Sequence, residues 1–217
     1  MIILAINTAS SRTGIALFES VTGDTSPKLL AENSWAAHNN EAEKLMPAIA
    51  ELLKRAGQTF SAIKQIYIVK GPGSFTGLRV GVTVANTIAY LNKCELFGIT
   101  TFEYWHSVSD LPIVLYAGSG GVYLSLNRAS APQLIKLDEL NYILKKQKIE
   151  EVSGDISDDQ KAILKTAKFL DSKKTFGEII KIIIAENLWK QTSQPEKLIK
   201  PLYIKEPSIS VPKTKIT

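Results

Sequence analysis

The chain has little of the chemistry that supports disulfides or metal sites. Among its 217 residues there are one cysteine and two histidines. The lone Cys94 excludes an internal disulfide and a multi-cysteine zinc site, and it fits a reducing cytosol. His38 and His106 form neither an HxxxH nor an HExxH pair, so we predict no metal site.

Long hydrophobic runs are also missing. No stretch reaches the roughly 18 apolar residues that a membrane span needs. The apolar opening, residues 1–6, is too short for a signal-peptide core and has no basic leader, so we expect a buried first strand. These features predict a cytoplasmic protein with no membrane partner. Hydrophobic residues make up 45% of the chain, which excludes wholesale disorder.

No strong excess of one charge is present. The net charge is +5. The first 108 residues carry 9 Lys and Arg against 8 Asp and Glu, and the remainder carries 17 against 13. Because acids are interspersed among the bases of the second half, we expect a solvated surface there rather than an RNA-binding patch.

The first half of the chain shows clear alternation of strands and helices. Apolar residues at steps of three and four predict a helix over 40–56, with Pro47 inside it as a bend or a lost backbone bond. β-branched runs predict strands, and a polar turn over residues 7–14 joins the first two as a hairpin. The expected strands are residues 2–6, 15–18, 29–35, 64–69 and 96–99, with a second helix over residues 78–92.

The second half gives weaker signals. Strands are expected at 113–116, 122–126 and 151–155. Helices are expected at 138–147, 159–171 and 174–191.

The glycine-rich stretch Gly71-Pro72-Gly73-Ser74-Phe75-Thr76-Gly77 is the strongest local signal. A loop between a strand and a helix can present backbone N–H groups to an anion. The stretch fits neither GxxxxGK[ST] nor GxGxxG, so we interpret it as a structural loop in preference to a phosphate site. Ser74 and Thr76 can cap the following helix. Arg79 lies in the first helical turn, where the macrodipole does not favour a cation, and this suggests a carboxylate or phosphate partner.

Small side chains recur along the second helix. Gly81, Ala85 and Ala89 are spaced by four residues and form one narrow ridge, which allows another element to approach closely. Such a helix is either buried in the fold or paired with another subunit, and composition does not choose between them.

Candidate catalytic groups are sparse. Asn7 ends the first strand, where a carboxylate would be expected in an enzyme, and an amide cannot act as a general base. Ser10, Ser11 and Ser74 have no His and Asp partners at a recognisable spacing, which leaves a serine hydrolase unsupported.

Several segments together resemble one known family. ILAINTASSRTGIAL resembles the opening hairpin of the ASKHA fold (acetate kinase, sugar kinase, Hsp70 and actin). GPGSFTGLRVGVTVANTIAY is similar to the signature of the TsaB (YeaZ) family, which takes part in bacterial threonylcarbamoyladenosine synthesis in tRNA. The segment from His38 to Leu53 and the late Pro201-Leu202-Tyr203-Ile204-Lys205 resemble that family too.

The resemblance implies an α/β, two-lobed, actin-like fold of the ASKHA, ribonuclease H-like class, with a shortened second lobe. The implied boundaries are residues 1–102 for the first lobe and 103–205 for the second. Residues 206–217 are expected to be a disordered tail.

The same resemblance implies a non-catalytic scaffold rather than an enzyme. Family members pair with TsaD, the catalytic subunit, and the ATPase TsaE joins the pair. The resemblance therefore implies that this chain reaches tRNA only indirectly, through the complex. No cofactor is implied for this chain alone, and ATP or ADP at the interface of the complex is left open. The implied partner interface consists of Leu45, Ile49, Leu52, Leu78, Val82, Ala85 and Ala89, with Arg79 as a polar contact across it.

The chain departs from the family pattern at two places, and three other functions are alternatives to the scaffold. The family usually has Asp at the position of Asn7, and its acidic residue and Arg before the middle strand are replaced by residues 117–121. An ASKHA phosphotransferase that binds ATP between its lobes is one alternative, and a homodimeric binding module that uses the same helices is another. A protease has no nucleophile, base or metal set to support it.

Overall fold

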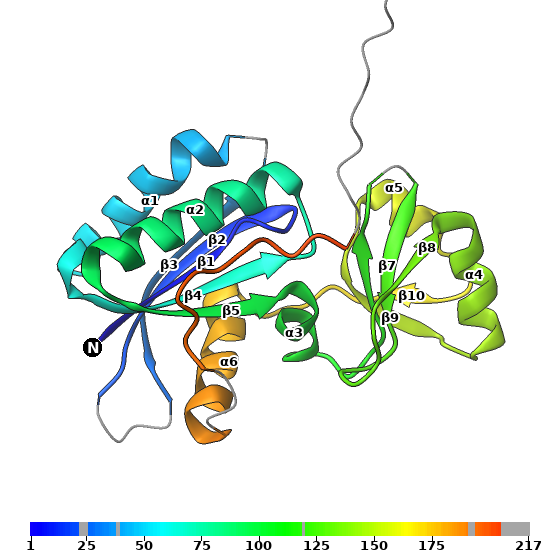
Figure 1. Cartoon of the computed structure of the whole chain (residues 1–217). Coiled ribbons are helices and arrows are strands. Elements are labelled where there is room, and N and C mark those ends of the chain that lie inside the picture. Colours follow the sequence, from blue (N-terminus) through cyan, green and yellow to red (C-terminus); the bar gives the residue numbers. More distant parts are fainter. Residues whose placement is uncertain (22–25, 38–39, 119, 191–193, 205–217) are drawn as a thin grey trace, which may run out of the picture.

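Two five-stranded sheets, each covered by helices, organise the computed structural model of the chain (Figure 1). The structure describes residues 1–21, 26–37, 40–118, 120–190 and 194–204, and for residues 187–190 only the backbone. No helix within these ranges is long and apolar enough to cross a membrane.

The first sheet has the strand order β3-β2-β1-β4-β5. β1 lies at the centre of this sheet. All its residues are buried, because both faces of the sheet are covered there. β1 pairs antiparallel with β2 and parallel with β4, and β5 continues the parallel half. The strands are β1 (Ile2–Asn7), β2 (Arg12–Glu19), β3 (Lys28–Ala36), β4 (Ile63–Gly71) and β5 (Glu95–Thr100).

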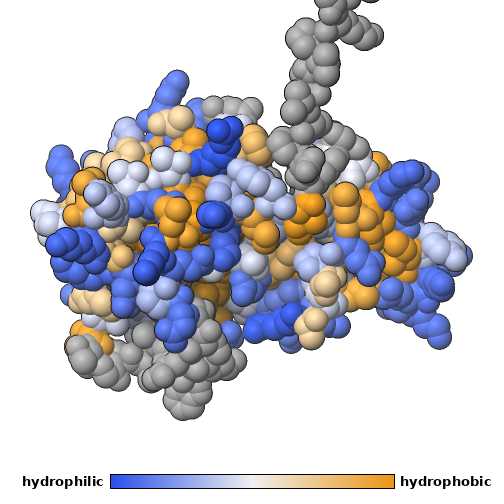
Figure 2. All heavy atoms as spheres, in the orientation of Figure 1, coloured by the Kyte–Doolittle hydropathy of each residue, from blue (hydrophilic) through white to orange (hydrophobic). Residues whose placement is uncertain are grey.

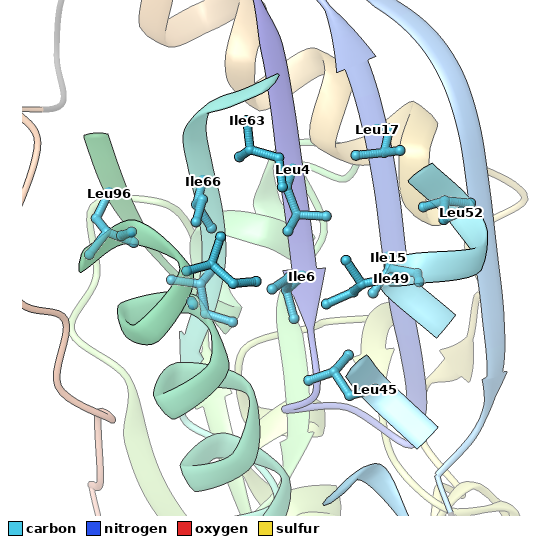
Figure 3. Close-up of a cluster of buried hydrophobic side chains, with 14 of the residues drawn as sticks. Leu4, Ile6, Ile15, Leu17, Leu45, Ile49, Leu52, Ile63, Ile66 and Leu96 are labelled. Atoms are coloured by element: carbon cyan, nitrogen blue, oxygen red, sulfur yellow. The ribbon is translucent and has the colours of Figure 1, made fainter. Parts of the chain in front are cut away.

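Two helices, α1 (Glu41–Arg55) and α2 (Phe75–Asn92), lie side by side on one face of this sheet (Figure 1). Pro47 is tolerated in α1 because it lies on the exposed face, where water can bind the carbonyl that loses its partner. A short 3₁₀ turn, η1 (Phe60–Ala62), leads into β4. Apolar side chains of both helices and of the strands form one buried cluster (Figure 3).

The opposite face of the first sheet is covered by α6 (Phe176–Lys190). This helix is apolar around much of its circumference, and Phe176, Ile179, Ile180, Ile183 and Ile184 pack against the sheet. Residues 194–204 then run along the edge of the same lobe. The backbone N–H of Glu196 donates to the Leu96 carbonyl at 2.8 Å.

The second sheet has the order β10-β9-β6-β7-β8. α4 (Leu137–Lys146) covers one of its faces, while α3 (Thr101–His106) packs against the other and joins the two lobes. α5 (Asp158–Ile163) follows β9. The strands are β6 (Ile113–Tyr116), β7 (Gly121–Ser125), β8 (Gln133–Lys136), β9 (Glu151–Asp155) and β10 (Lys168–Phe169).

The predicted two-lobed α/β fold is confirmed, with three local corrections. α2 begins at Phe75 rather than Leu78. The helix expected over 159–171 is wrong, because α5 ends at Ile163 and the chain then turns to pair β10 with β9. α3 and β8 were not predicted, since a six-residue helix and a four-residue strand carry too few residues for a periodic pattern.

Placement of the last segments differs from the expected division into lobes. A second lobe over 103–205 was expected, but α6 and residues 194–204 pack on the first sheet. The reason is that the first sheet has two apolar faces, and α1 and α2 cover only one. The second sheet is therefore inserted between α3 and α6. The tail predicted over 206–217 lies outside the described residues.

Candidate partner-binding site

The seven predicted interface residues lie inside the chain's own core. Leu45, Ile49 and Leu52 of α1 point toward strands β1 and β2 (Figure 3). The other four lie on the sheet side of α2. All of them, Leu45, Ile49, Leu52, Leu78, Val82, Ala85 and Ala89, are between 0 and 5% exposed. The prediction that these side chains contact a partner is therefore wrong, because an apolar helical stripe fits the chain's own sheet equally well.

The ridge of small residues on α2 has the same explanation. A Cβ at Gly81 would lie 2.1 Å from Oγ1 of Thr8, and one at Gly77 would lie 2.0 Å from the Thr8 carbonyl oxygen. These distances are far below van der Waals contact. Gly81 thus lets α2 lie close to the residue that follows β1, while Ala85 and Ala89 pack in the cluster shared with the sheet and with α1.

The solvent face of α2 is unusual for its lack of charge. Arg79 is the one charged residue among the 18 residues of the helix. Tyr90 is 84% exposed and Leu91 is 71% exposed, while Thr83 and Thr87 are exposed on the same helix. A helix that faces water normally carries charged side chains on that side. This surface, Thr83, Thr87, Tyr90 and Leu91, is called the α2 outer face below.

The neighbouring helix presents a mixed surface. α1 exposes Met46 beside Ala42 and Ala50, and it also exposes five charged side chains. Figure 2 shows pale and orange spheres over the region of these two helices, with blue charged groups around them. An apolar strip with a charged margin is the pattern of an interface core and its rim.

The glycine-rich stretch connects β4 to α2 and serves local packing. Gly71 ends β4, residues 72–74 form the connection, and Phe75, Thr76 and Gly77 form the first turn of α2, so the predicted loop is shorter than expected. The side chain of Ser74 caps the helix by accepting the Gly77 N–H at 3.2 Å.

Backbone groups of this connection are bonded within the chain. Ser74 donates its N–H to the Ala9 carbonyl at 2.8 Å, and a Cβ at Gly73 would lie 2.1 Å from that same oxygen. The hydroxyl of Thr101 donates to the Pro72 carbonyl at 2.6 Å. Donors that are used in this way support a structural role for the loop rather than a phosphate cradle.

Arg79 is exposed and lies against an aromatic ring. Its guanidinium carbon is 5.3 Å from the centroid of the Phe75 ring, which in turn is 4.9 Å from the ring of Tyr203. No ion pair within the described part of the chain includes Arg79. Because α2 begins at Phe75 and not at Leu78, Arg79 lies in the second turn, where the macrodipole has little effect, so its expected unfavourable position is wrong. The cation–π contact holds the guanidinium against Phe75, and the side chain remains available to an external anion.

A hollow lies between the two lobes. This cleft of about 650 Å³ is lined by the β1–β2 turn, the end of β9 and the start of α6. Asn7 lies at its edge and is 2% exposed; its Oδ1 accepts the Ala9 N–H at 2.9 Å and its Nδ2 donates to Ser10 Oγ at 3.0 Å. The amide is thus used to shape the turn.

The base of the cleft is narrowed by an aromatic ring. A Cβ at Gly14 would lie 2.6 Å from the ring of Phe176, so the ring packs directly on the turn. Asn7 cannot act as a general base, while the carboxylates that line the cleft, Asp155, Asp158 and Asp171, come from the second lobe and the segment before α6.

The remaining candidate residues have structural surroundings. His106 is buried, and its Nε2 lies 3.0 Å from Ser125 Oγ. Burial lowers the pKa of His106. Burial also raises the pKa of the half-buried Cys94 thiol, because it disfavours the charged form of both groups. Across the described residues there is no group of three His, Cys, Asp or Glu side chains able to hold a metal ion. His38 lies outside the described residues.

Three comparisons with known proteins show what the chain is similar to. The family model described as "TsaD: tRNA N6-adenosine threonylcarbamoyltransferase" matches residues 35–124. The TsaB protein of Bacillus subtilis is 34% identical over 103 residues, which cover 48% of this chain and 42% of that protein. The solved structure of YeaZ from Pseudomonas aeruginosa superposes with a TM-score of 0.68 over 94% of this chain and 99% of that one, at 16% identity. The chain is thus similar in sequence to TsaB proteins over about half of its length, and it shares the fold of YeaZ over nearly all of it.

Two further comparisons extend the similarity beyond the first half of the chain. The chain covers less than half the length of the B. subtilis TsaB protein, while a TsaB protein of Buchnera aphidicola from Baizongia pistaciae is 28% identical over 77% of this chain and 85% of that protein. A tRNA N6-adenosine threonylcarbamoyltransferase of Ralstonia pickettii is 26% identical over 78% of this chain and 50% of that protein. TsaB and TsaD proteins are therefore both similar to this chain.

Proposed function

We propose that this chain is a TsaB-family protein and a non-catalytic scaffold subunit in threonylcarbamoyladenosine formation. In this proposal it pairs with TsaD, TsaE joins the pair, and the modified tRNAs are those that read codons starting with adenine. The names of its relatives place them in this biosynthesis, and the cytoplasm, where tRNA is modified, is the proposed location.

One observation carries the pairing. The α2 outer face has no charge, and two of its large side chains are more than two thirds exposed. Leaving such a surface in water forgoes about 25 cal/mol for each Å² of apolar area that a partner would bury. We assign the partner contact to this face and to Met46 of α1, in place of the seven buried residues.

A non-catalytic role is supported by the cleft between the lobes. The amide of Asn7 is bonded into the β1–β2 turn, and Phe176 packs on Gly14. The alternative, an ATP-dependent phosphotransferase, requires a general base, and the amide of Asn7 at the end of β1 cannot act as one. A homodimer formed through the α2 outer face remains the second candidate, because an uncharged face can also pair with its own copy.

The test is light scattering on a sizing column. The chain is run alone, with TsaD from the same organism, and with TsaD, TsaE and ATP. We expect a one-to-one complex with TsaD that replaces any homodimer. Threonylcarbamoyladenosine formation by the reconstituted mixture should then depend on this chain. If the chain elutes at its own mass in every mixture and its omission leaves product formation unchanged, the scaffold proposal is refuted.

A further inference from the structure

The two lobes are joined by a contact between the β1–β2 turn and the end of β9. The backbone N–H of Ser11 donates to Oδ2 of Asp155 at 2.8 Å, and the Ser11 hydroxyl donates to Oδ1 at 2.6 Å. One residue of the first lobe thus satisfies both oxygens of a carboxylate in the second. Bonds of N–H and O–H groups to an ionised carboxylate are stronger than bonds between neutral groups.

Asp155 is held in place by the backbone that precedes it. Gly154 has φ = +135°, and a Cβ there would lie 2.1 Å from the Val114 carbonyl oxygen. Any other residue would push β9 away from β6, where Leu115 pairs with Asp155. The carboxylate is therefore delivered by a fixed strand end and not by a loose loop.

The turn that receives the carboxylate is also preformed. The amide of Asn7 accepts the Ala9 N–H and donates to Ser10 Oγ, which fixes the turn from inside. The Ser11 N–H and hydroxyl therefore point at one place before any anion arrives, and such a pair of donors is a small anion-binding site. Asp155 fills it.

The contact lies where it can control the cleft. Ser11 and Asp155 both line the hollow of about 650 Å³ between the lobes. At the other side of the junction, Phe102 of α3 packs with the apolar side chains Ile113, Leu115 and Tyr123 of the second sheet. An ion pair of 3.5 Å between Arg128 and Glu186 of α6 also joins the lobes there, and His106 Nε2 lies 3.0 Å from Ser125 Oγ. An apolar contact can act as a pivot, whereas the Ser11–Asp155 bonds must break when the cleft opens.

We propose that Asp155 is an internal latch. It keeps the two lobes closed, and it occupies the donors of the β1–β2 turn as a built-in competitor of external anions. While the latch is closed, the turn accepts no phosphate. The inference goes beyond the scaffold role, because it concerns the cleft and not the α2 outer face.

The test compares Asp155→Ala with Asp158→Ala. Asp158 lines the same cleft, and its side chain is fully exposed, so its removal controls for the loss of one negative charge there. Three quantities are measured: amide hydrogen exchange at Ser11 by NMR, the distance between fluorophores on the two lobes, and the response of the Ser11 amide signal to inorganic phosphate.

In Asp155→Ala we expect exchange at Ser11 to be at least about tenfold faster, the distance to increase, and phosphate to shift the Ser11 signal. Wild type and Asp158→Ala should show none of these changes. Unchanged exchange protection of the Val114 amide establishes that the variant is folded, and Asp155→Asn, which keeps the side-chain shape, should give an intermediate result. Exchange, distance and phosphate response in Asp155→Ala that match the wild type would overturn the proposal.

Discussion

Ala85 and Thr83 lie on opposite sides of α2, and a glutamate placed at each should have opposite effects. Ala85 is fully buried in the cluster between α2 and the first sheet. Thr83 is exposed on the α2 outer face. The same added charge therefore tests, on one helix, which side faces the core and which side faces a partner.

For Ala85→Glu the cost follows from burial. Forcing a longer side chain into a packed core costs about 1–3 kcal/mol, and desolvating an unpaired carboxylate adds several kcal/mol. A loss of at least about 4 kcal/mol lowers the melting temperature by about 8–16 °C in a chain of this size. Total stabilities are about 5–15 kcal/mol, so the variant is expected to lose between about a quarter and four fifths of its free energy of unfolding.

For Thr83→Glu the cost in the free chain is small. Exposed substitutions usually change stability by less than about 0.5 kcal/mol, which is about 1–2 °C. At an apolar interface the unpaired charge should cost about 3 kcal/mol, which weakens TsaD binding by more than about 100-fold. Thr83→Gln, which has nearly the same shape and no charge, is the matched control and should bind far more tightly.

Thermal unfolding followed by circular dichroism gives the stabilities, and light scattering with TsaD gives the binding. One result would refute the reasoning: Ala85→Glu melts within about 2 °C of the wild type and loses TsaD, while Thr83→Glu keeps it. That outcome would mean that the buried stripe of α2, and not its outer face, meets the partner.

Three further predictions concern the packing of the first lobe and its junction. Asn86→Ala removes two hydrogen bonds to the Ile199 backbone, of 2.9 and 3.0 Å. We therefore expect the free energy of unfolding to fall by about 1–3 kcal/mol and amide exchange at Ile199 to become faster. Unchanged exchange would show that residues 194–204 are held by other contacts. Gly81→Ala should destabilise the chain by about 1–3 kcal/mol, and adding Thr8→Ala should recover part of that loss, as measured by urea unfolding of a double-mutant cycle. Burial lowers the pKa of His106, so the unfolded chain binds more protons than the folded chain below about pH 6.5. The melting temperature should therefore fall further between pH 7.5 and pH 5.5 in the wild type than in His106→Asn. Equal falls in the two proteins would contradict this reasoning.

The first sheet could be predicted from sequence because its signals are local. The buried run of β1, the hairpin turn and the periodic stripe of α1 each occupy one continuous segment. The cap of α2 was also recognisable, since Ser74 precedes the helix, although the helix was expected to begin three residues too late.

The direction of a helical stripe could not be predicted. The spacing of Leu45, Ile49 and Leu52 indicates that one side of the helix is apolar, but it does not indicate what covers that side. The outer face of α2 could have been predicted from the near absence of charge in 18 residues. The ridge of small residues instead led to a predicted partner contact on the buried side of the helix. Its cause, the close approach of Thr8 to Gly81, depends on two segments far apart in the sequence.

The site between the lobes was beyond sequence patterns for a similar reason. Ser11 and Asp155 are 144 residues apart, and neither belongs to a spaced motif. The return of α6 to the first sheet could not be foreseen either, because an apolar helix carries no indication of which sheet it covers.

The insertion of the second lobe between α3 and α6 has a consequence for synthesis on the ribosome. After the strands of the first sheet have emerged, roughly 75 further residues must be made before α6 can cover the exposed apolar face, about 4–15 s at 5–20 residues per second. During this interval the nascent chain carries an open hydrophobic surface, which a chaperone can bind. Premature termination anywhere in the second lobe should therefore yield an aggregating product rather than a stable half-protein.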